Sequence, residues 1–380
     1  MLKFRVLGGV GEKGRVGFEI LIDKKRIVFD YGVKRKFGSN VDEVYPMEPS
    51  GPLDFLFISH SHLDHVGAIP LLDFSYIVCS KPTSILLESQ VRNWMSVAGK
   101  LLKDEGRYKR FLESSPVFKE RPMDLPVKIG RSGHVVGSRW IFLKKYSFLY
   151  TGDVTLDSPL YTFDPFPKAD VLVVDTAYGI KKLRKREELL NLLDVKDKRI
   201  VLPVPEIGRS QEILVKLLEN GMEPVFVDEN ILKGFEFLEK HESTKVRVDM
   251  SGINSSIPKK LPYGIYLATD GMITSGTSKI LFELLKEEKN TTFVITGHVE
   301  EGTPGWKLLN EDGRAISFVW KVHPDAEDLL KIIDTVAPRV VIPFHSRRED
   351  LDSVKCFLEK NGSKVLIPKK GEFIDMEAIL

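Results

Sequence analysis

Three histidines and an aspartate fall within six residues of this 380-residue chain, in the segment His60-Ser-His62-Leu-Asp64-His65. The apolar run 53–59 ends directly on this segment, so the cluster is expected at the end of a β-strand. Along extended backbone, residues two apart point to the same side, and His60 and His62 can therefore hold one ion. Once the chain turns, Asp64 and His65 can face a second ion. Imidazole and carboxylate ligands suit zinc, and the segment predicts a catalytic metal site.

Three other side chains that could bind metal lie beside apolar runs. Asp153 follows the run 148–151, and His345 follows the run 340–344. His134 lies in the loop Gly-His-Val-Val-Gly between two strand-like segments. Ligands placed just past strand ends are what a metal site at the edge of a β-sandwich requires. These residues are therefore candidate ligands from distant parts of the chain.

The pattern of apolar runs predicts an α/β protein with two domains. Hydrophobic residues make up 42% of the chain, enough for a sizeable core, and the length accommodates two domains. Residues 84–99 have helical periodicity. Up to about residue 180 short strands dominate, and beyond it strands and helices alternate, as in a parallel sheet flanked by helices. The expected strands are 3–7, 18–22, 26–30, 53–59, 141–143, 148–151, 171–174, 200–204, 224–227, 265–268, 293–296, 316–320 and 340–344.

Composition excludes several classes of protein. Two cysteines, Cys79 and Cys356, are too few for a disulfide framework or a cysteine-rich zinc site. No apolar run reaches the roughly 18 residues that cross a membrane, and the N-terminal segment has no signal-peptide character. A cytoplasmic protein without membrane contact is expected. The net charge of +2 neither requires nor excludes a nucleic-acid partner, because a local basic patch can bind phosphates.

The order of the metal-binding motifs over residues 3–178 resembles the metallo-β-lactamase family. Asp30, in Phe-Asp-Tyr-Gly, matches the first motif of that family, and residues 60–65 match the second. His134 matches the third motif and Asp153 the fourth. The resemblance implies two Zn²⁺ ions bridged by Asp153. Their expected ligands are His60, His62 and His134 for one ion, and Asp64 and His65 for the other.

Later segments resemble the β-CASP subfamily of the same family. The segments 171–179, 202–212, 270–276 and 300–305 match its motifs, so the resemblance covers nearly the whole chain. It implies an αββα sandwich formed by residues 1–179 and 316–380. An α/β cap domain, residues 180–315, is expected as an insertion in it.

The same resemblance implies a zinc-dependent ribonuclease that hydrolyses RNA phosphodiester bonds in RNA processing or decay. Asp175, His323 and His345 fall at three extra motifs of the subfamily, and a histidine at the third marks its RNA-processing members. His345 would complete the second zinc site, beside Asp64. His323, oriented by Asp175, is the expected general acid, with hydroxide attack supported by two metal ions. This chain has Lys321 where relatives usually carry serine.

Substrate-binding residues are expected in the cap. Arg209 lies near a predicted helix N-terminus, where its side chain and the backbone amides can bind a phosphate. Ser275 and Ser278, in a Ser-Gly turn region, are further candidates.

Two other functions and two finer questions remain open at this point. A non-catalytic RNA-binding subunit of a processing complex would have lost metal ligands, whereas every expected ligand is present. A small-molecule metallo-hydrolase would not need β-CASP motifs. The sequence does not separate endonuclease from 5′-exonuclease action, and it leaves a homodimer open.

Overall fold

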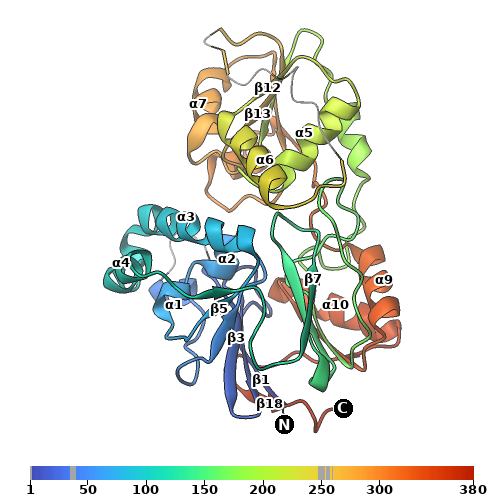
Figure 1. The fold of residues 1–380 in the computed structure, drawn as a ribbon. Helices are drawn as coiled ribbons and strands as arrows, with labels where there is room; N and C mark the ends of the chain where they lie inside the picture. The colour runs from blue at the N-terminus through green and yellow to red at the C-terminus, as the bar shows by residue number, and fades with distance from the viewer. Residues whose placement is uncertain (1, 35–39, 247–252, 254–256, 259) are drawn as a thin grey trace. The chain divides into compact units, whose positions relative to one another are not determined.

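The computed structural model describes residues 2–34, 40–246, 253, 257–258 and 260–380. They form two compact units, both seen in Figure 1. The first consists of Met1–Leu156, Phe163–Lys182 and His323–Leu380, and the second of Asp157–Thr162 and Leu183–Val322. Within the described ranges, no helix combines the length and the apolar character that a bilayer-spanning helix needs.

The first unit contains two β-sheets. One has the strand order β18-β1-β2-β3-β4-β5-β6, and the other has the order β17-β16-β10-β9-β8-β7. The strands of the first sheet are β1 (Leu2–Gly8), β2 (Gly17–Ile22), β3 (Lys25–Tyr31), β4 (Phe55–Phe57), β5 (Ile77–Val78), β6 (Phe118–Lys119) and β18 (Phe373–Asp375). Those of the second are β7 (Val127–Arg131), β8 (Arg139–Leu143), β9 (Phe148–Tyr150), β10 (Val171–Asp175), β16 (Val340–Phe344) and β17 (Lys364–Val365).

The two sheets pack face to face. Their shared core includes Phe4 and Phe18 from the first sheet and Phe148, Tyr150 and Phe344 from the second, all of them buried. Phe18 contacts Tyr150 and Phe344 edge-on, with ring centroids 5.6 and 5.5 Å apart. Successive side chains of β1 point to opposite faces of the sheet, so Phe4 and Val6 face the core while Lys3 and Arg5 do not.

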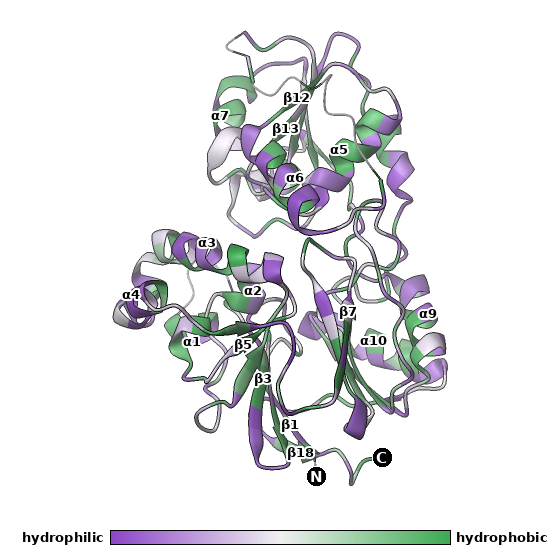
Figure 2. Cartoon of the chain, viewed as in Figure 1, coloured by the Kyte–Doolittle hydropathy of each residue, from purple (hydrophilic) through white to green (hydrophobic). Residues whose placement is uncertain are grey.

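Helices cover the outer face of each sheet. The first sheet packs on α1 (Val41–Val44), α2 (Leu63–Val66), α3 (Lys81–Ala98) and α4 (Glu105–Glu113). The second packs on α9 (Ala326–Val336) and α10 (Arg348–Lys360). In Figure 2, α3 and α10 carry both hydrophilic and hydrophobic residues, as helices with one buried face do. The first unit is therefore an αββα sandwich.

Strand direction brings distant residues to one edge of the sandwich. β10 runs parallel to both β9 and β16, and β3 runs parallel to β4. The carboxyl ends of parallel strands meet at one edge of a sheet. The segments that follow β4, β9 and β16 carry His60, Asp153 and His345, and β10 ends on Asp175. One edge of the first unit thus collects the candidate ligands.

The second unit has one parallel sheet with helices packed on it. Its strand order is β12-β13-β11-β14-β15. The strands are β11 (Arg199–Pro203), β12 (Val225–Val227), β13 (Gly264–Ala268), β14 (Thr291–Ile295) and β15 (Ala315–Ser317). The helices are α5 (Arg209–Glu219), α6 (Glu229–His241), α7 (Gly276–Leu285) and α8 (Pro304–Asn310). Buried Leu202 and Leu267 of the sheet pack with Ile213 of α5 and Ile231 of α6.

Two of the expected strands differ in the structure, and β5, β6, β7, β17 and β18 were not predicted from the sequence. The run 316–320, expected in the αββα sandwich, instead starts with β15, which pairs in parallel with β14 of the second unit. Its neighbours Phe318 and Trp320 are buried in the core of that unit. The run 53–59 forms only the three-residue strand β4, and Leu53 pairs with Phe74 in an isolated bridge outside it.

A buried carboxyl group lies in the core of the second unit. Glu212 of α5 is fully buried and accepts hydrogen bonds from the Ser158 hydroxyl and, at 2.6 Å, from the Trp320 indole. Burial raises the pKa of Glu212, and the charge of Arg186 and the two hydrogen bonds only partly offset it. Folding therefore favours the protonated form of Glu212.

We expect Glu212→Gln to stabilise the second unit at neutral and alkaline pH. A group whose pKa is raised on folding contributes its stability below the unfolded pKa and loses it as pH rises through the folded pKa. The loss is at most about 1.4 kcal/mol per pH unit, and neutral glutamine does not incur it. Thermal melting of both proteins from mildly acidic to alkaline pH should show the curves diverging. Parallel curves would contradict the assignment.

Candidate active site

The first group of candidate ligands combines three histidines with Asp153. One ligand atom each from His60, His62, His134 and Asp153 lies within 4.8 Å of all the others. His62 Nδ1 is 3.2 Å from His134 Nε2. Asp153 Oδ2 is 3.7 Å from His60 Nε2 and 3.6 Å from His134 Nε2. These separations suit several side chains that surround one cation.

The second group lies on the other side of Asp153. It consists of Asp64, His65 and His345, whose ligand atoms also lie within 4.8 Å of one another. His345 Nε2 is 2.9 Å from Asp64 Oδ2, and His65 Nε2 is 3.9 Å from the same oxygen. Asp153 presents its other oxygen, Oδ1, to His65 Nε2 at 3.3 Å. Each oxygen of Asp153 therefore faces a different group.

Several buried polar atoms in these groups have no hydrogen-bond partner in the described part of the chain. They are His60 Nε2, His65 Nε2, His345 Nδ1 and Asp153 Oδ1. Buried polar groups in native proteins are nearly always satisfied, and unsatisfied ones call for an explanation such as a bound ion. Imidazoles and carboxylates suit zinc. The residues present therefore fit bound metal, with one set of ligand atoms facing each oxygen of Asp153.

The histidines of the two groups differ in the direction in which their pKa values are shifted. Burial lowers the pKa of His62 to about 4 and the pKa of His60 well below its usual value. Neutral imidazoles offer a lone pair to a cation. Burial also acts to lower the pKa of His65, but the charges of Asp153, Asp30 and Asp64 outweigh it and raise that pKa. A cation that binds at His65 must displace this proton.

Asp30 fixes the orientation of the His65 ring through a hydrogen bond to Nδ1. Its carboxylate accepts hydrogen bonds from His65 Nδ1 at 2.7 Å, from the Ser59 hydroxyl at 2.6 Å and from the Tyr150 hydroxyl at 2.6 Å. The Ser59 backbone N–H also donates to it, at 2.7 Å. The bond to Nδ1 fixes the tautomer that leaves Nε2 free for a metal. Asp30 was predicted from its motif. Ser59 and Tyr150 were not, because both belong to strand-like runs that resemble ordinary core.

The turn that carries Asp64 requires a glycine at position 32. A Cβ on Gly32 would lie 1.7 Å from the Asp64 carbonyl oxygen, so no side chain fits. The Gly32 N–H donates to the Val16 carbonyl, and the Val16 N–H donates to the Asp64 carbonyl at 2.9 Å. The backbone of α2 is thereby held against β3, and Asp64 and His65 face the same side as His345.

Asp175 and His323 form a hydrogen-bonded pair beside the first group. His323 Nδ1 donates to Asp175 Oδ2 at 2.8 Å and lies 3.8 Å from Asp153 Oδ2. Asp175 is fully buried and also accepts from the backbone N–H groups of Ala177 and Val154. The His323 side chain is 14% exposed. Tyr178, not identified from the sequence, packs edge-on against His323 at 5.2 Å.

Asp153, Asp175 and His323 could themselves hold an ion by distance alone. Asp153 already faces the other two groups, and both oxygens of Asp175 accept hydrogen bonds. Nδ1 of His323 is likewise engaged. The pairing therefore favours a histidine that is oriented by Asp175 and whose Nε2 remains available for proton transfer.

The predicted substrate-binding residues lie in the second unit. Arg209 begins α5, and its Nε donates to the Thr296 hydroxyl at 3.2 Å. A Cβ on Gly297 would lie 2.4 Å from the Arg209 guanidinium, so that glycine leaves room for the side chain. Ser278 is buried and donates to the Asp270 carbonyl, and the Ser275 hydroxyl donates to the Asp270 carboxylate at 2.9 Å. Both serines hold their loop, and their contact with substrate stays a prediction.

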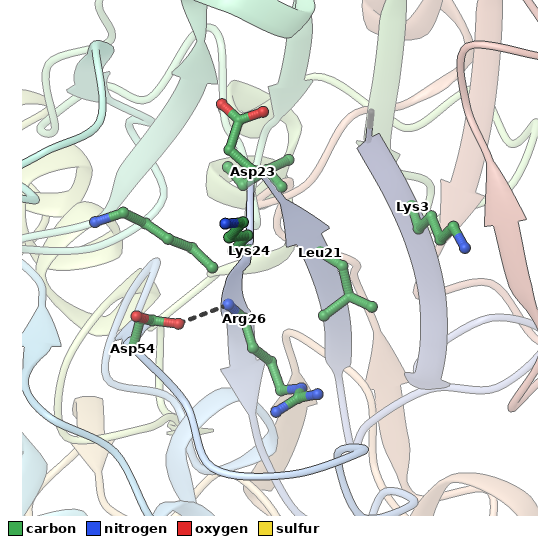
Figure 3. A pocket seen from close by; sticks show the side chains of 8 residues that line it. Lys3, Leu21, Asp23, Lys24, Arg26 and Asp54 are labelled. Carbon is green, nitrogen blue, oxygen red and sulfur yellow. Dashed lines mark hydrogen bonds between the residues drawn. The ribbon is translucent and has the colours of Figure 1, made fainter.

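A pocket of about 640 Å³ lies away from these groups, around the turn between β2 and β3. Its lining includes Lys3, Lys24, Arg26 and two aspartates. In Figure 3 the side chains of Lys3 and Arg26 point in different directions, and the Arg26 backbone N–H donates to Asp54 at 2.7 Å. Positively charged side chains that point apart do not bind one ligand together. The metal-ligand groups therefore remain the candidate site.

Comparison with protein families gives two matches along the chain. Residues 18–203 match the metallo-beta-lactamase superfamily, and residues 211–308 match the Beta-Casp domain. A solved structure of a protein of unknown function from Enterococcus faecalis V583 has a TM-score of 0.63 over 98% of this chain and 99% of that chain. At 15% identity that likeness concerns the fold alone.

Curated relatives match over most of the chain. An RNase J-like protein of Methanocaldococcus jannaschii is 26% identical over 92% of this chain and 93% of its own length. RNase aCSPSF2 of Saccharolobus solfataricus is 25% identical over 98% of this chain and 85% of its own. Transcription termination factor FttA of Thermococcus kodakarensis is 24% identical over 98% of this chain and 71% of its own.

Proposed function

We propose that this chain, which belongs to the metallo-β-lactamase superfamily and carries a Beta-Casp domain, is a zinc-dependent ribonuclease that hydrolyses RNA phosphodiester bonds. The observation that carries the proposal is the presence of two ligand groups, each facing a different oxygen of Asp153, with the Asp175–His323 pair beside the first group. Two relatives that match most of this chain are named as RNases or RNase-like, which supports RNA as the substrate.

The proposed ligands follow the two groups. His60, His62 and His134 would hold one zinc ion, Asp64, His65 and His345 the other, and Asp153 both. Bound zinc ions supply Lewis-acid chemistry, because they lower the pKa of water and neutralise charge on a phosphate. Asp30 keeps the ring of His65 in the orientation that ligation needs.

His323 is the proposed general acid. Its Nδ1 is held by Asp175, so Nε2 is the atom that would deliver a proton to the leaving oxygen of the scissile bond. The fully buried carboxylate of Asp175 accepts the hydrogen bond from Nδ1 and thereby fixes the plane of the imidazole ring. Asp175 is therefore a positioning residue.

The second unit is the proposed β-CASP cap, and residues 211–308 of it match the Beta-Casp domain. In that unit Arg209 is the proposed phosphate-binding side chain, since its position at the start of α5 adds backbone N–H groups to a guanidinium. A cytoplasmic location and a homodimer are further expectations, and light scattering would test the latter.

The test uses RNA with a 5′-monophosphate, a 5′-triphosphate or a 5′-hydroxyl, labelled at either end. We expect cleavage that a chelator abolishes and added zinc restores. Internal fragments would indicate endonuclease action, and mononucleotide release that depends on the 5′ group would indicate 5′-exonuclease action.

Two outcomes would contradict the proposal. Hydrolysis of small esters without any cleavage of RNA would identify a small-molecule hydrolase. RNA binding by a purified protein that neither contains nor responds to zinc would identify a non-catalytic RNA-binding subunit.

A further inference from the structure

The glycine-rich loop 9–16, between β1 and β2, lies directly against the second ligand group. The His345 backbone N–H donates to the Gly9 carbonyl at 2.7 Å, and the Val16 N–H donates to the Asp64 carbonyl at 2.9 Å. Both ends of the loop are therefore fixed to residues that carry candidate ligands. Lys13 lies between these two anchors.

The loop also lies against helix α10, and so does the segment 176–181. A Cβ on Gly11 would lie 3.5 Å from Cδ of Arg348, in the first turn of that helix. A Cβ on Gly179, in the segment that follows β10, would lie 3.7 Å from Cβ of Asp350. The loop and the 176–181 segment thus pack on the same end of one helix.

Each of these three segments contributes a cation. They are Lys13 from the loop, Lys181 from the segment after β10, and Arg347 at the start of α10. Burial lowers the pKa of Lys13, and the nearby charges of Arg347 and Lys181 lower it further. Asp175 and Asp350 act in the opposite direction with smaller effects. Lys13 therefore lies within electrostatic range of the two other cations and of Asp175, the residue that orients His323.

The charges of these cations are poorly compensated within the protein. In the described part of the chain, no carboxylate lies within 4.0 Å of the Lys13 or the Lys181 ammonium group, and Arg347 reaches only the exposed Glu349, at 3.4 Å. On the same loop, by contrast, Arg15 is paired with Glu12 at 2.8 Å. Like charges that nearby carboxylates compensate only in part raise the free energy of the unbound protein, and an anion relieves that cost.

We infer that Lys13, Lys181 and Arg347 form a binding subsite for a backbone phosphate of RNA that neighbours the scissile phosphate. The inference rests on the proposed ribonuclease function and adds a contact with the substrate that the metal ligands do not provide. An RNA strand carries a phosphate at every nucleotide, so a strand held at the ligand groups presents a second one nearby. Lysine offers a compact charge and arginine a planar fork for its oxygens.

The experiment measures binding of a fluorescent single-stranded RNA over a series of KCl concentrations. A His323→Ala background keeps the RNA intact during the measurement. We expect Lys13→Gln to weaken binding about 3- to 10-fold and to reduce the slope of log K against log salt by about 0.7, the value for one contact with a single strand. Lys13→Arg should restore both. In the parent with His323, Lys13→Gln should raise KM more than it lowers kcat.

The matched control is Lys24→Gln, an exposed lysine in the turn between β2 and β3. It should leave affinity, salt slope and KM unchanged. Should Lys13→Gln lower the melting temperature, Lys181→Gln provides the second variant, with the same expected loss.

Three outcomes would overturn the subsite. Parental affinity and salt slope in both Lys13→Gln and Lys181→Gln, with RNA cleavage intact, would remove the subsite and leave the ribonuclease proposal standing. An equal loss in Lys24→Gln would show a general charge effect instead of a subsite. Failure of the parent protein both to bind and to cleave RNA would overturn the proposed function and the subsite together.

Discussion

His323→Ala should lower the rate of RNA cleavage by about 10²- to 10⁴-fold, the usual effect of a lost acid–base group. The physical reason is that the leaving oxygen gains negative charge as the bond breaks, and Nε2 of His323 is the proposed source of its proton. Zinc content should be unchanged, because His323 bonds to Asp175 and belongs to neither proposed ligand set. RNA binding should persist as well.

A substrate with a good leaving group distinguishes proton donation by His323 from a role in packing alone. An aryl phosphodiester needs no proton on its leaving oxygen, so the defect should shrink on that substrate. Asp175→Asn should give a milder form of the same pattern, because it removes the charge that holds the imidazole while leaving the ring in place. Equal loss on RNA and on the aryl substrate, with a lower melting temperature, would mean that His323 serves packing alone.

His62→Ala should remove zinc and abolish cleavage together. His62 contributes Nδ1 to the first group, 3.2 Å from His134 Nε2, so its removal leaves that group one ligand short. Measured by elemental analysis, the parent should carry about two zinc ions per chain and the variant fewer. Because zinc binds the folded state, its loss should also lower the melting temperature, and added zinc should raise that temperature less than in the parent.

His298→Ala is the matched control for His62→Ala. This histidine is 40% exposed, pairs with Glu300 at 3.0 Å and belongs to neither ligand group. It should retain zinc content and activity. Full cleavage by His62→Ala in a preparation shown to be free of zinc would rule out the proposed metal site.

Sequence alone identified the residues that the structure brings together. His60, His62, Asp64 and His65 lie within one short segment, so local spacing was enough to group them. Asp153 and His345 were found because each follows an apolar run, and Asp175 was found through its resemblance to a β-CASP motif. The structure brings them together because the carboxyl ends of parallel strands meet at one edge. Membership in the metallo-β-lactamase superfamily with a Beta-Casp domain was likewise apparent from the motifs and is confirmed.

Tertiary structure alone decided which atoms face one another. The two oxygens of Asp153 point to different groups, and Tyr150 reaches Asp30 across 120 residues of sequence. Neither fact has a local signal, because Tyr150 occupies a core position like any other aromatic residue. The placement of β15 with β14 was also undetermined, since a short apolar run fits the edge of either sheet. The charged neighbours of Lys13 could not be predicted from the sequence either. Spacing along the chain determines contacts within a strand or a turn, whereas charged residues from separate segments come together only when the whole core has packed.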